Sequence, residues 1–105
     1  MISMDEEALI GEVVTLLFAF ASPNRYRILK RLCEQEMNVS ALCHELDIHQ
    51  STLSRELSLL LAHGFLTQRR EQSRHYYSCN HEGVKKLMKT LDEVLQEHAK
   101  NMSHD

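Results

Sequence analysis

The sequence predicts a mainly α fold of about five helices with a small antiparallel sheet of two or three strands. Two observations lead to this prediction. Apolar residues recur at helical spacing in five segments, and two short strand-like segments, 65–70 and 74–79, follow the fourth of them. The chain has 105 residues, 43% of them hydrophobic and 26% charged, which is typical of one soluble globular domain spanning residues 1–105.

The first helix, expected from Asp5 to Phe20, is apolar on two faces. One stripe consists of Leu9, Val13, Leu16, Leu17 and Phe20, and the second consists of Ile10, Val14 and Phe18. A helix with two apolar faces needs two apolar neighbours, so we expect it to pack on its own core and on a partner. Ser22 and Pro23 start a second helix, because serine caps free amides and proline lacks an N–H. This helix runs to about Glu34.

Residues 39–63 predict a helix-turn-helix. After a short extended segment at 37–39, Ser40 is the expected N-cap of a third helix, whose apolar side consists of Val39, Leu42, Cys43 and Leu46. A three-residue turn at 47–49 leads to a fourth helix, expected from Gln50 to His63 and ended by Gly64. A hairpin at 65–79, the wing, follows with its tip at 71–73. This order is that of a winged helix-turn-helix.

The last helix, expected to be capped by Asn80, carries one long apolar stripe formed by Val84, Leu87, Met88, Leu91, Val94 and Leu95. A chain of this length buries only about two-thirds of its unfolded surface alone, so sharing apolar helices with a second copy adds burial. We therefore expect a homodimer formed through residues 1–21 and 80–105. The predicted contacts are Leu9, Val13, Leu17, Leu87, Leu91 and Leu95.

The fourth helix has a polar face suited to a DNA groove. Its buried stripe is expected to be Leu53, Leu57, Leu60 and Leu61, and the opposite side presents Ser51, Ser54, Arg55 and Ser58, with Gln50 and Thr52 beside the first turn. Arginine suits guanine, glutamine suits adenine, and hydroxyls suit phosphates or base edges. A merely solvated helix face would more often interleave Glu and Lys, and the nearest acid, Glu56, lies on the flank.

The wing is basic around its tip, where Arg69, Arg70, Arg74 and His75 stand. Such residues can follow the DNA backbone or enter a minor groove, although basic residues also protect the edge strands of ordinary hairpins. The charge of the whole chain is −3, but residues 24–78 hold eight Lys/Arg against six acids, while the two ends hold four Lys against nine acids. This division fits a middle that faces phosphate.

Other classes of protein find little support in the sequence. It contains no glycine-rich phosphate loop and no HExxH or GxSxG motif, so we do not expect an enzyme. No apolar run reaches the length of a membrane helix, and the acidic N-terminus is unlike a secretory signal. Three cysteines without framework spacing suit reduced thiols, so we expect a cytoplasmic protein.

Residues Ala19 to Tyr77 resemble the ArsR/SmtB family of metal- and stress-responsive repressors. The stretches that carry the resemblance are AFASPNRYRILKRL, NVSALCHEL, HQSTLSRELSLLLAHGFL and RHYYS. The resemblance implies a dimer, formed through the first and last helices, that binds an imperfect palindrome and is released by an inducer. His49 stands where most relatives have serine or proline, Glu56 stands where they have histidine, and the wing lacks the usual glycine.

The family's two best-known sensor sites are broken in this sequence. The positions of its C-x-C pair hold Asn38 and Ser40, and those of its zinc site on the last helix hold His81, Gly83, Val94 and Glu97, of which two cannot bind metal. Cys33, Cys43 and Cys79 remain as candidates for binding a thiophilic metal or metalloid ion, or for oxidation. Pairing of 37–39 with the second wing strand should bring Cys79 toward Cys33 or Cys43. The alternative is that cysteines on apolar helix faces are core residues. His98 and His104, with Asp105 and the acids of the N-terminus, are a further candidate for a metal site across the dimer.

The sequence thus predicts a sequence-specific DNA-binding repressor that acts as a homodimer on a palindromic operator and responds to a metal, a metalloid or a thiol oxidant. Two alternatives stay open. One is a regulator of the same type without a metal effector. The other is a winged helix used for protein contact, since a fold does not dictate function.

Overall fold

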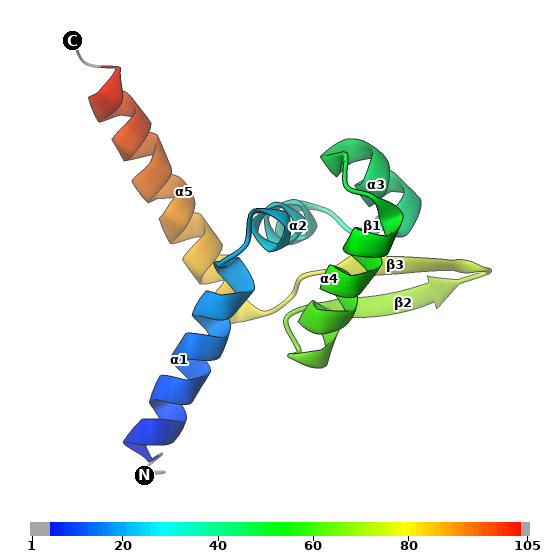
Figure 1. Cartoon of the computed structure of the whole chain (residues 1–105), viewed down its shortest axis with the longest axis horizontal. Coiled ribbons are helices and arrows are strands. Elements are labelled where there is room, and N and C mark those ends of the chain that lie inside the picture. The colour runs from blue at the N-terminus through cyan, green and yellow to red at the C-terminus, as the bar shows by residue number, and fades with distance from the viewer. Residues whose placement is uncertain (1–4, 104–105) are drawn as a thin grey trace.

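The computed structural model describes residues 5–103 (Figure 1). Along the chain the elements are α1 (Glu6–Phe20), α2 (Pro23–Glu34), β1 (Met37–Asn38), α3 (Val39–Leu46), α4 (Gln50–Ala62), β2 (Thr67–Glu71), β3 (Arg74–Ser78) and α5 (Glu82–Met102). The predicted mainly α fold of five helices with a small antiparallel sheet is confirmed. His104 and Asp105, part of the candidate terminal metal site, lie outside the described residues.

The core lies where α2, α3 and α4 meet the first turns of α5. Its fully buried side chains include Ile28, Leu29, Leu42, Leu53, Leu57, Leu60 and Val84. On α4 these residues stand three or four positions apart, which places them on one face of the helix. The predicted apolar faces of the two helices in the helix-turn-helix are therefore the faces that fold inward.

The three strands form an antiparallel sheet in the order β1-β3-β2. Met37 pairs with Tyr77 and Asn38 with Tyr76, which confirms the predicted pairing of this segment with the second wing strand. The hairpin is closed by Gln72 and Ser73 alone, since Glu71 pairs with Arg74 inside the ladder. Gln72 takes the left-handed backbone conformation (φ 57°) that glycine usually supplies in such turns. The tip is thus one residue shorter than predicted.

Two predicted helix caps are wrong. Asn38, not Ser40, caps α3, because its side-chain oxygen accepts a hydrogen bond from the amide of Ala41 at 2.8 Å. His81, not Asn80, caps α5, because its ring Nδ1 accepts from the amide of Val84 at 3.1 Å. Each cap lies within two residues of the expected one, since a second polar residue that can cap stands close by at both sites.

The ends of α3 and α4 follow the predicted turn chemistry. Asp47 ends α3 in the left-handed conformation (φ 52°, ψ 47°), and Gly64 follows α4 with φ 76°. At α4 the amide of Phe65 bonds the carbonyl of Leu60 and the amide of Gly64 bonds that of Leu61, a Schellman arrangement. Phe65 and Leu66 are consequently buried connectors, so β2 begins at Thr67 and not at Phe65.

Two helices, α1 and α5, diverge from one side of the molecule, while the hairpin projects on the other side (Figure 1). Large apolar side chains stay exposed on both helices: Leu9, Ile10, Val13, Val14, Leu17 and Phe18 on α1, and Val94, Leu95 and Met102 on α5. The predicted Leu87 and Leu91 are half-buried and line an apolar groove of about 470 Å³ with Leu17 and Leu95. Within residues 5–103, no helix is both long and apolar enough to cross a membrane.

Candidate nucleic-acid interface

Helix α4 is fixed in the fold by its buried side and by both of its ends. Leu53, Leu57 and Leu60 are at most 1% exposed and anchor the helix in the core. At the start, Nδ1 of His49 accepts a hydrogen bond from the amide of Ser51 at 3.3 Å and lies 2.9 Å from its hydroxyl oxygen. The histidine found where relatives have serine or proline thus serves as the N-cap.

The opposite side of α4 faces solvent as predicted. Gln50, Ser51, Ser54, Arg55 and Ser58 are exposed, and Thr52 is partly buried at the edge of this set. Across residues 5–103, Arg55 takes part in no ion pair, whereas four other arginine and lysine residues do. A guanidinium that the fold does not engage is available to an external acceptor. We call these six residues the α4 face.

The single acid of α4, Glu56, is held away from that face by Arg25. Nη1 of Arg25 lies 3.2 Å from Oε2 of Glu56, and the two side chains are only 11% and 18% exposed. Arg25 also donates from Nε and Nη2 to the carbonyl of Phe18, at 3.2 and 2.9 Å, and stacks over the Phe18 ring. One side chain therefore links the end of α1, the start of α2 and the middle of α4.

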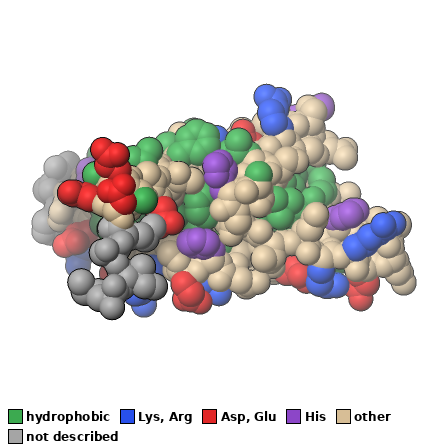
Figure 2. Space-filling model, turned by 90° about the horizontal axis from the view of Figure 1, so that it is seen from below, with side chains coloured by type: hydrophobic (Ala, Val, Ile, Leu, Met, Phe, Trp, Pro, Cys, Tyr) green, Lys and Arg blue, Asp and Glu red, His purple; other side chains and the backbone are tan. Residues whose placement is uncertain are grey.

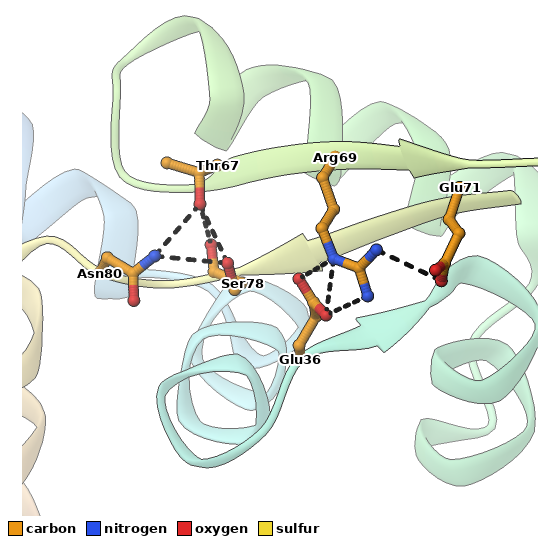
Figure 3. A network of polar contacts seen from close by, with 6 residues as sticks. All are labelled: Glu36, Thr67, Arg69, Glu71, Ser78 and Asn80. Atoms are coloured by element: carbon orange, nitrogen blue, oxygen red, sulfur yellow. Dashed lines mark hydrogen bonds and ion pairs between the residues drawn. The ribbon is translucent and has the colours of Figure 1, made fainter.

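Within the wing, Arg69 is engaged by the protein itself. Its guanidinium pairs with Glu36 at 2.8 Å and with Glu71 at 3.3 Å (Figure 3) and also lies over the Tyr76 ring. The hydrogen bonds that Arg69 donates to these two carboxylates, first to that of Glu36, raise its pKa. Nearby, Asn80 donates to the hydroxyl oxygens of Thr67 and Ser78 and closes the base of the hairpin. Arg69 thus helps to hold the wing against the segment that precedes β1.

The other predicted wing residues are placed toward solvent near the tip. Arg70, Arg74 and His75 are exposed, and Nε of Arg70 donates to the Gln72 carbonyl at 3.2 Å. Arg74 and His75 line a hollow of about 310 Å³ together with Ser40 at the start of α3. Figure 2 shows Lys, Arg and His side chains at the wing end of the molecule, with Asp or Glu side chains close to them, and a group of Asp and Glu side chains at the N-terminal end. The tip of the wing and the start of α3 therefore share one basic, polar hollow.

Sequence and structure comparisons identify the family. A helix-turn-helix domain model matches residues 20–69. The chain is 38% identical over 78 residues to the nodulation protein NolR of Rhizobium meliloti, covering 74% of this chain and 64% of that one. It is 30% identical over 81 residues to the arsenical resistance operon repressor of Staphylococcus xylosus, covering 77% and 78%. The homodimeric winged helix-turn-helix DNA-binding domain of Mb0332 from Mycobacterium bovis, a possible ArsR-family regulator, superposes with a TM-score of 0.81 at 29% identity, covering 100% and 99%.

The chain belongs to the ArsR/SmtB family. It is therefore a DNA-binding transcriptional regulator with a winged helix-turn-helix, as predicted, in a family of regulators and not of enzymes. Double-stranded DNA is the partner that this membership implies. The α4 face lies on the second helix of the helix-turn-helix, the helix that enters the DNA groove in this motif.

The thiols of this ArsR/SmtB protein fall into two groups. Cys33 at the end of α2 and Cys79 after β3 are near each other, because the amide of Cys79 donates a hydrogen bond to the carbonyl of Leu32 at 3.2 Å. Of the two partners that the predicted strand pairing left open for Cys79, the structure places Cys33 beside it. Cys43 lines a separate hollow on α3 with His44 and Gln50. No three His, Cys, Asp or Glu side chains among residues 5–103 are grouped as metal ligands would be. The structure thus separates one thiol pair from one single thiol.

Two interface residues were missed by the sequence reasoning. Arg25 was counted only toward the basic charge of the middle segment, although it fixes Glu56, and Glu36 was not linked to Arg69. The second link was within reach of prediction. Glu36 directly precedes β1, and the expected pairing of β1 with the wing places its carboxylate beside the hairpin.

Proposed function

We propose that this protein is a cytoplasmic, sequence-specific repressor that binds a palindromic operator as a homodimer. The observation that carries the proposal is the α4 face, which is exposed, almost free of acid, and backed by three fully packed leucines. A rigid helix with short polar side chains and one unpaired arginine can enter a major groove without steric or charge conflict. Arg55 is assigned to guanine, and Gln50 to adenine or phosphate.

The wing is assigned to the DNA backbone. Arg74 and His75 border the hollow beside the start of α3, and Arg70 stands next to them, so a phosphate lying there would meet several donors. Arg69 has a different role. Because it is paired with Glu36 and Glu71, it keeps the hairpin in position instead of offering its charge to DNA.

The homodimer is assigned to α1 and α5. Leu9, Val13 and Leu17 are each about half exposed, as is Leu95 of α5, and a monomer that leaves such a continuous apolar surface in water is unfavourable. Pairing through these helices places two recognition helices on one side of the assembly. Reading both half-sites of a palindrome requires them to be about 34 Å apart, one turn of DNA. A change in the packing of α1 or α5 would therefore change affinity.

Selection from a pool of random DNA duplexes, followed by fluorescence anisotropy over a salt series, tests the proposal. We expect a palindromic site and an affinity that falls steeply with salt, because each phosphate contact releases counterions. Arg55→Ala should cost about 1–3 kcal/mol and relax the preference at one position per half-site, whereas Arg74→Ala should weaken all sequences alike and reduce the salt slope by about 1.

Lys100→Ala is the matched control, because it removes a positive charge from the last turn of α5, far from the wing (Figure 1). Its effect on binding should be small at moderate salt. If Arg55→Ala and Lys100→Ala behave alike, α4 does not read bases. If no duplex is selected but a protein partner binds the α4 face, the protein-contact alternative replaces the proposal.

A further inference from the structure

We propose that Cys33 and Cys79 form a dithiol that a hydroperoxide oxidises to a disulfide, and that this disulfide weakens DNA binding. The loss of DNA binding rests on the proposed function, while the oxidation of the dithiol does not depend on it. The two cysteines lie where elements end: Cys33 is near the end of α2, and Cys79 is the residue that joins β3 to the turn before α5.

The backbone holds the two cysteines at a fixed junction. The amide of Cys79 donates a hydrogen bond to the carbonyl of Leu32, the neighbour of Cys33, at 3.2 Å. The segment between the two cysteines contains β1, α3, α4 and the whole hairpin. A bond between the sulfurs would therefore close a loop around every DNA-contacting element and fix its base to α2 and α5.

The environment of the pair separates a nucleophile from a resolving thiol. Hydrogen bonding with Cys33 lowers the pKa of Cys79 to about 7, burial opposes this, and the backbone N–H of His81 and the charge of Lys85 lower it further. The same hydrogen bond, together with burial, raises the pKa of Cys33. Of the two thiols, Cys79 is therefore the one that ionises more readily to the thiolate, the reactive form, with a protonated thiol beside it.

A route from solvent reaches the pair. Cys33 is partly exposed and lines a groove of about 450 Å³ between α2 and α5, whose walls include Lys30, Lys85 and Lys89. The groove follows the charged side of α5, not the stripe of Leu87, Leu91 and Leu95 assigned to the dimer, so dimer formation leaves it open. Cys79 is only 2% exposed, which favours small oxidants such as hydrogen peroxide over bulky ones.

The chemistry balances with the hydroperoxide as the sole oxidant. The Cys79 thiolate attacks the peroxide, an S–O bond forms as the O–O bond breaks, and the leaving alkoxide or hydroxide takes up a proton. Cys33 then attacks the sulfenic sulfur of Cys79. The S–S bond forms, the S–O bond breaks, and the departing hydroxide leaves as water with the Cys33 proton. In total, the two thiols are oxidised by two electrons, and these electrons reduce the O–O bond of one hydroperoxide.

Oxidation must shift the segments that carry Cys33 and Cys79 toward each other. A disulfide holds its two sulfurs about 2.05 Å apart with a dihedral angle near 90°, whereas unbonded sulfurs remain at van der Waals distance. Both side chains are packed by the core, so the adjustment passes to β3 and to the first turn of α5. Recognition helix spacing depends on these elements. We expect at least a tenfold loss of operator affinity on oxidation, within the usual range of allosteric coupling.

The test uses the full chain, reduced and then treated with hydrogen peroxide. Intact mass spectrometry should report the loss of two hydrogen atoms, peptide mapping should join Cys33 to Cys79, and anisotropy should show the weaker binding, which dithiothreitol restores. Cys33→Ser and Cys79→Ser should each abolish both the cross-link and the change in affinity. Cys43→Ser, the matched control on α3, should retain both. Circular dichroism establishes that each variant is folded.

Three results would overturn the inference: no cross-link in the folded wild-type protein, a cross-link that requires Cys43, or a Cys33–Cys79 cross-link that leaves affinity unchanged. Failure of the DNA-binding function is recognised separately. In that case the reduced protein binds no duplex at all, while the mass measurement still decides whether the dithiol is oxidised as proposed.

Discussion

The contact between Arg25 and Glu56 provides a direct test of how the recognition helix is held. Nη1 of Arg25 lies 3.2 Å from Oε2 of Glu56, and the side chains are 11% and 18% exposed. Another pair, Arg31 with Glu45, is shorter at 2.7 Å but more exposed, at 26% and 42%. The two pairs therefore separate the effect of burial from that of distance.

Burial should decide the energies. Charged hydrogen bonds that are largely shielded from water contribute about 1.5–3 kcal/mol, whereas exposed ion pairs contribute about 0.2–1 kcal/mol. We expect a coupling free energy of about 2 kcal/mol between Arg25 and Glu56 and less than about 1 kcal/mol between Arg31 and Glu45. Arg25→Ala alone should cost more than this coupling, because it also removes the bonds to the Phe18 carbonyl.

Double-mutant cycles with Arg25→Ala and Glu56→Gln, and with Arg31→Ala and Glu45→Gln, measure both couplings by urea unfolding. The contacts of Arg25 with Phe18 are lost equally in the single and the double variant, so the cycle cancels them. Protein concentration must be constant, because the stability of a dimer depends on it. Equal couplings, or a larger one for Arg31 with Glu45, would refute the reasoning from burial.

Three further outcomes are expected. Leu17→Glu places a charge on the exposed apolar side of α1 and should convert the dimer to monomers in sedimentation velocity, while Glu12→Gln should not. Gly64→Ala should destabilise by about 1–2 kcal/mol in urea, since φ is 76° there, although the added Cβ meets no atom within 4 Å. Asp47→Gly, at φ 52°, should not show this loss. The ultraviolet absorbance of the Cys79 thiolate, measured in the Cys43→Ser variant, should rise with pH through about 7, and adding Cys33→Ala should move this rise to higher pH, because the hydrogen bond that favours the thiolate is gone. An unchanged pH profile in Cys33→Ala would contradict that cause.

Much of the fold followed from local rules in the sequence. The spacing of Leu53, Leu57 and Leu60 determined which side of α4 is buried, and the same periodicity left the serines and Arg55 outside. Helices α3 and α4 end at Asp47 and Gly64 because these two residue types adopt a positive φ more readily than most others. Such features depend on a residue and its near neighbours, so the chain alone is enough to predict them.

The errors came from choices that tertiary contacts decide. Asn38 caps α3 because its pairing with Tyr76 of β3 holds it extended, at φ −87° and ψ 169°, immediately before the helix. Asn80 does not cap α5, since its amide bonds Thr67 and Ser78 at the base of the hairpin. Local preference favours serine and asparagine as caps but cannot say which of two nearby polar residues the sheet will position before the helix.

In the candidate nucleic-acid interface, too, local rules predicted some features and tertiary contacts decided the others. Counting charges placed Arg69 with Arg70 and Arg74, whereas in the fold Glu36, 33 positions earlier, pairs with Arg69. Side chains of equal charge thus differ in role according to their partners. For Glu56, the partner resolves an apparent conflict: an acid next to a DNA-reading surface is tolerable because Arg25 balances it and holds it on the flank.

The DNA-contacting elements are connected to the two proposed dimerisation helices at different points. Arg25 connects the end of α1 to α4, and Cys79 connects β3 to the start of α5 beside Cys33. These two connections share α2, which carries Arg25 in its first turn and Cys33 near its end, but they share no hydrogen bond or ion pair in the described part of the chain. We therefore expect a change at the thiol pair to act mainly on the wing and α5, with the contact between Arg25 and Glu56 retained. Oxidation would alter how the recognition helices are spaced without unfolding them, which is the kind of change that a reversible regulator requires.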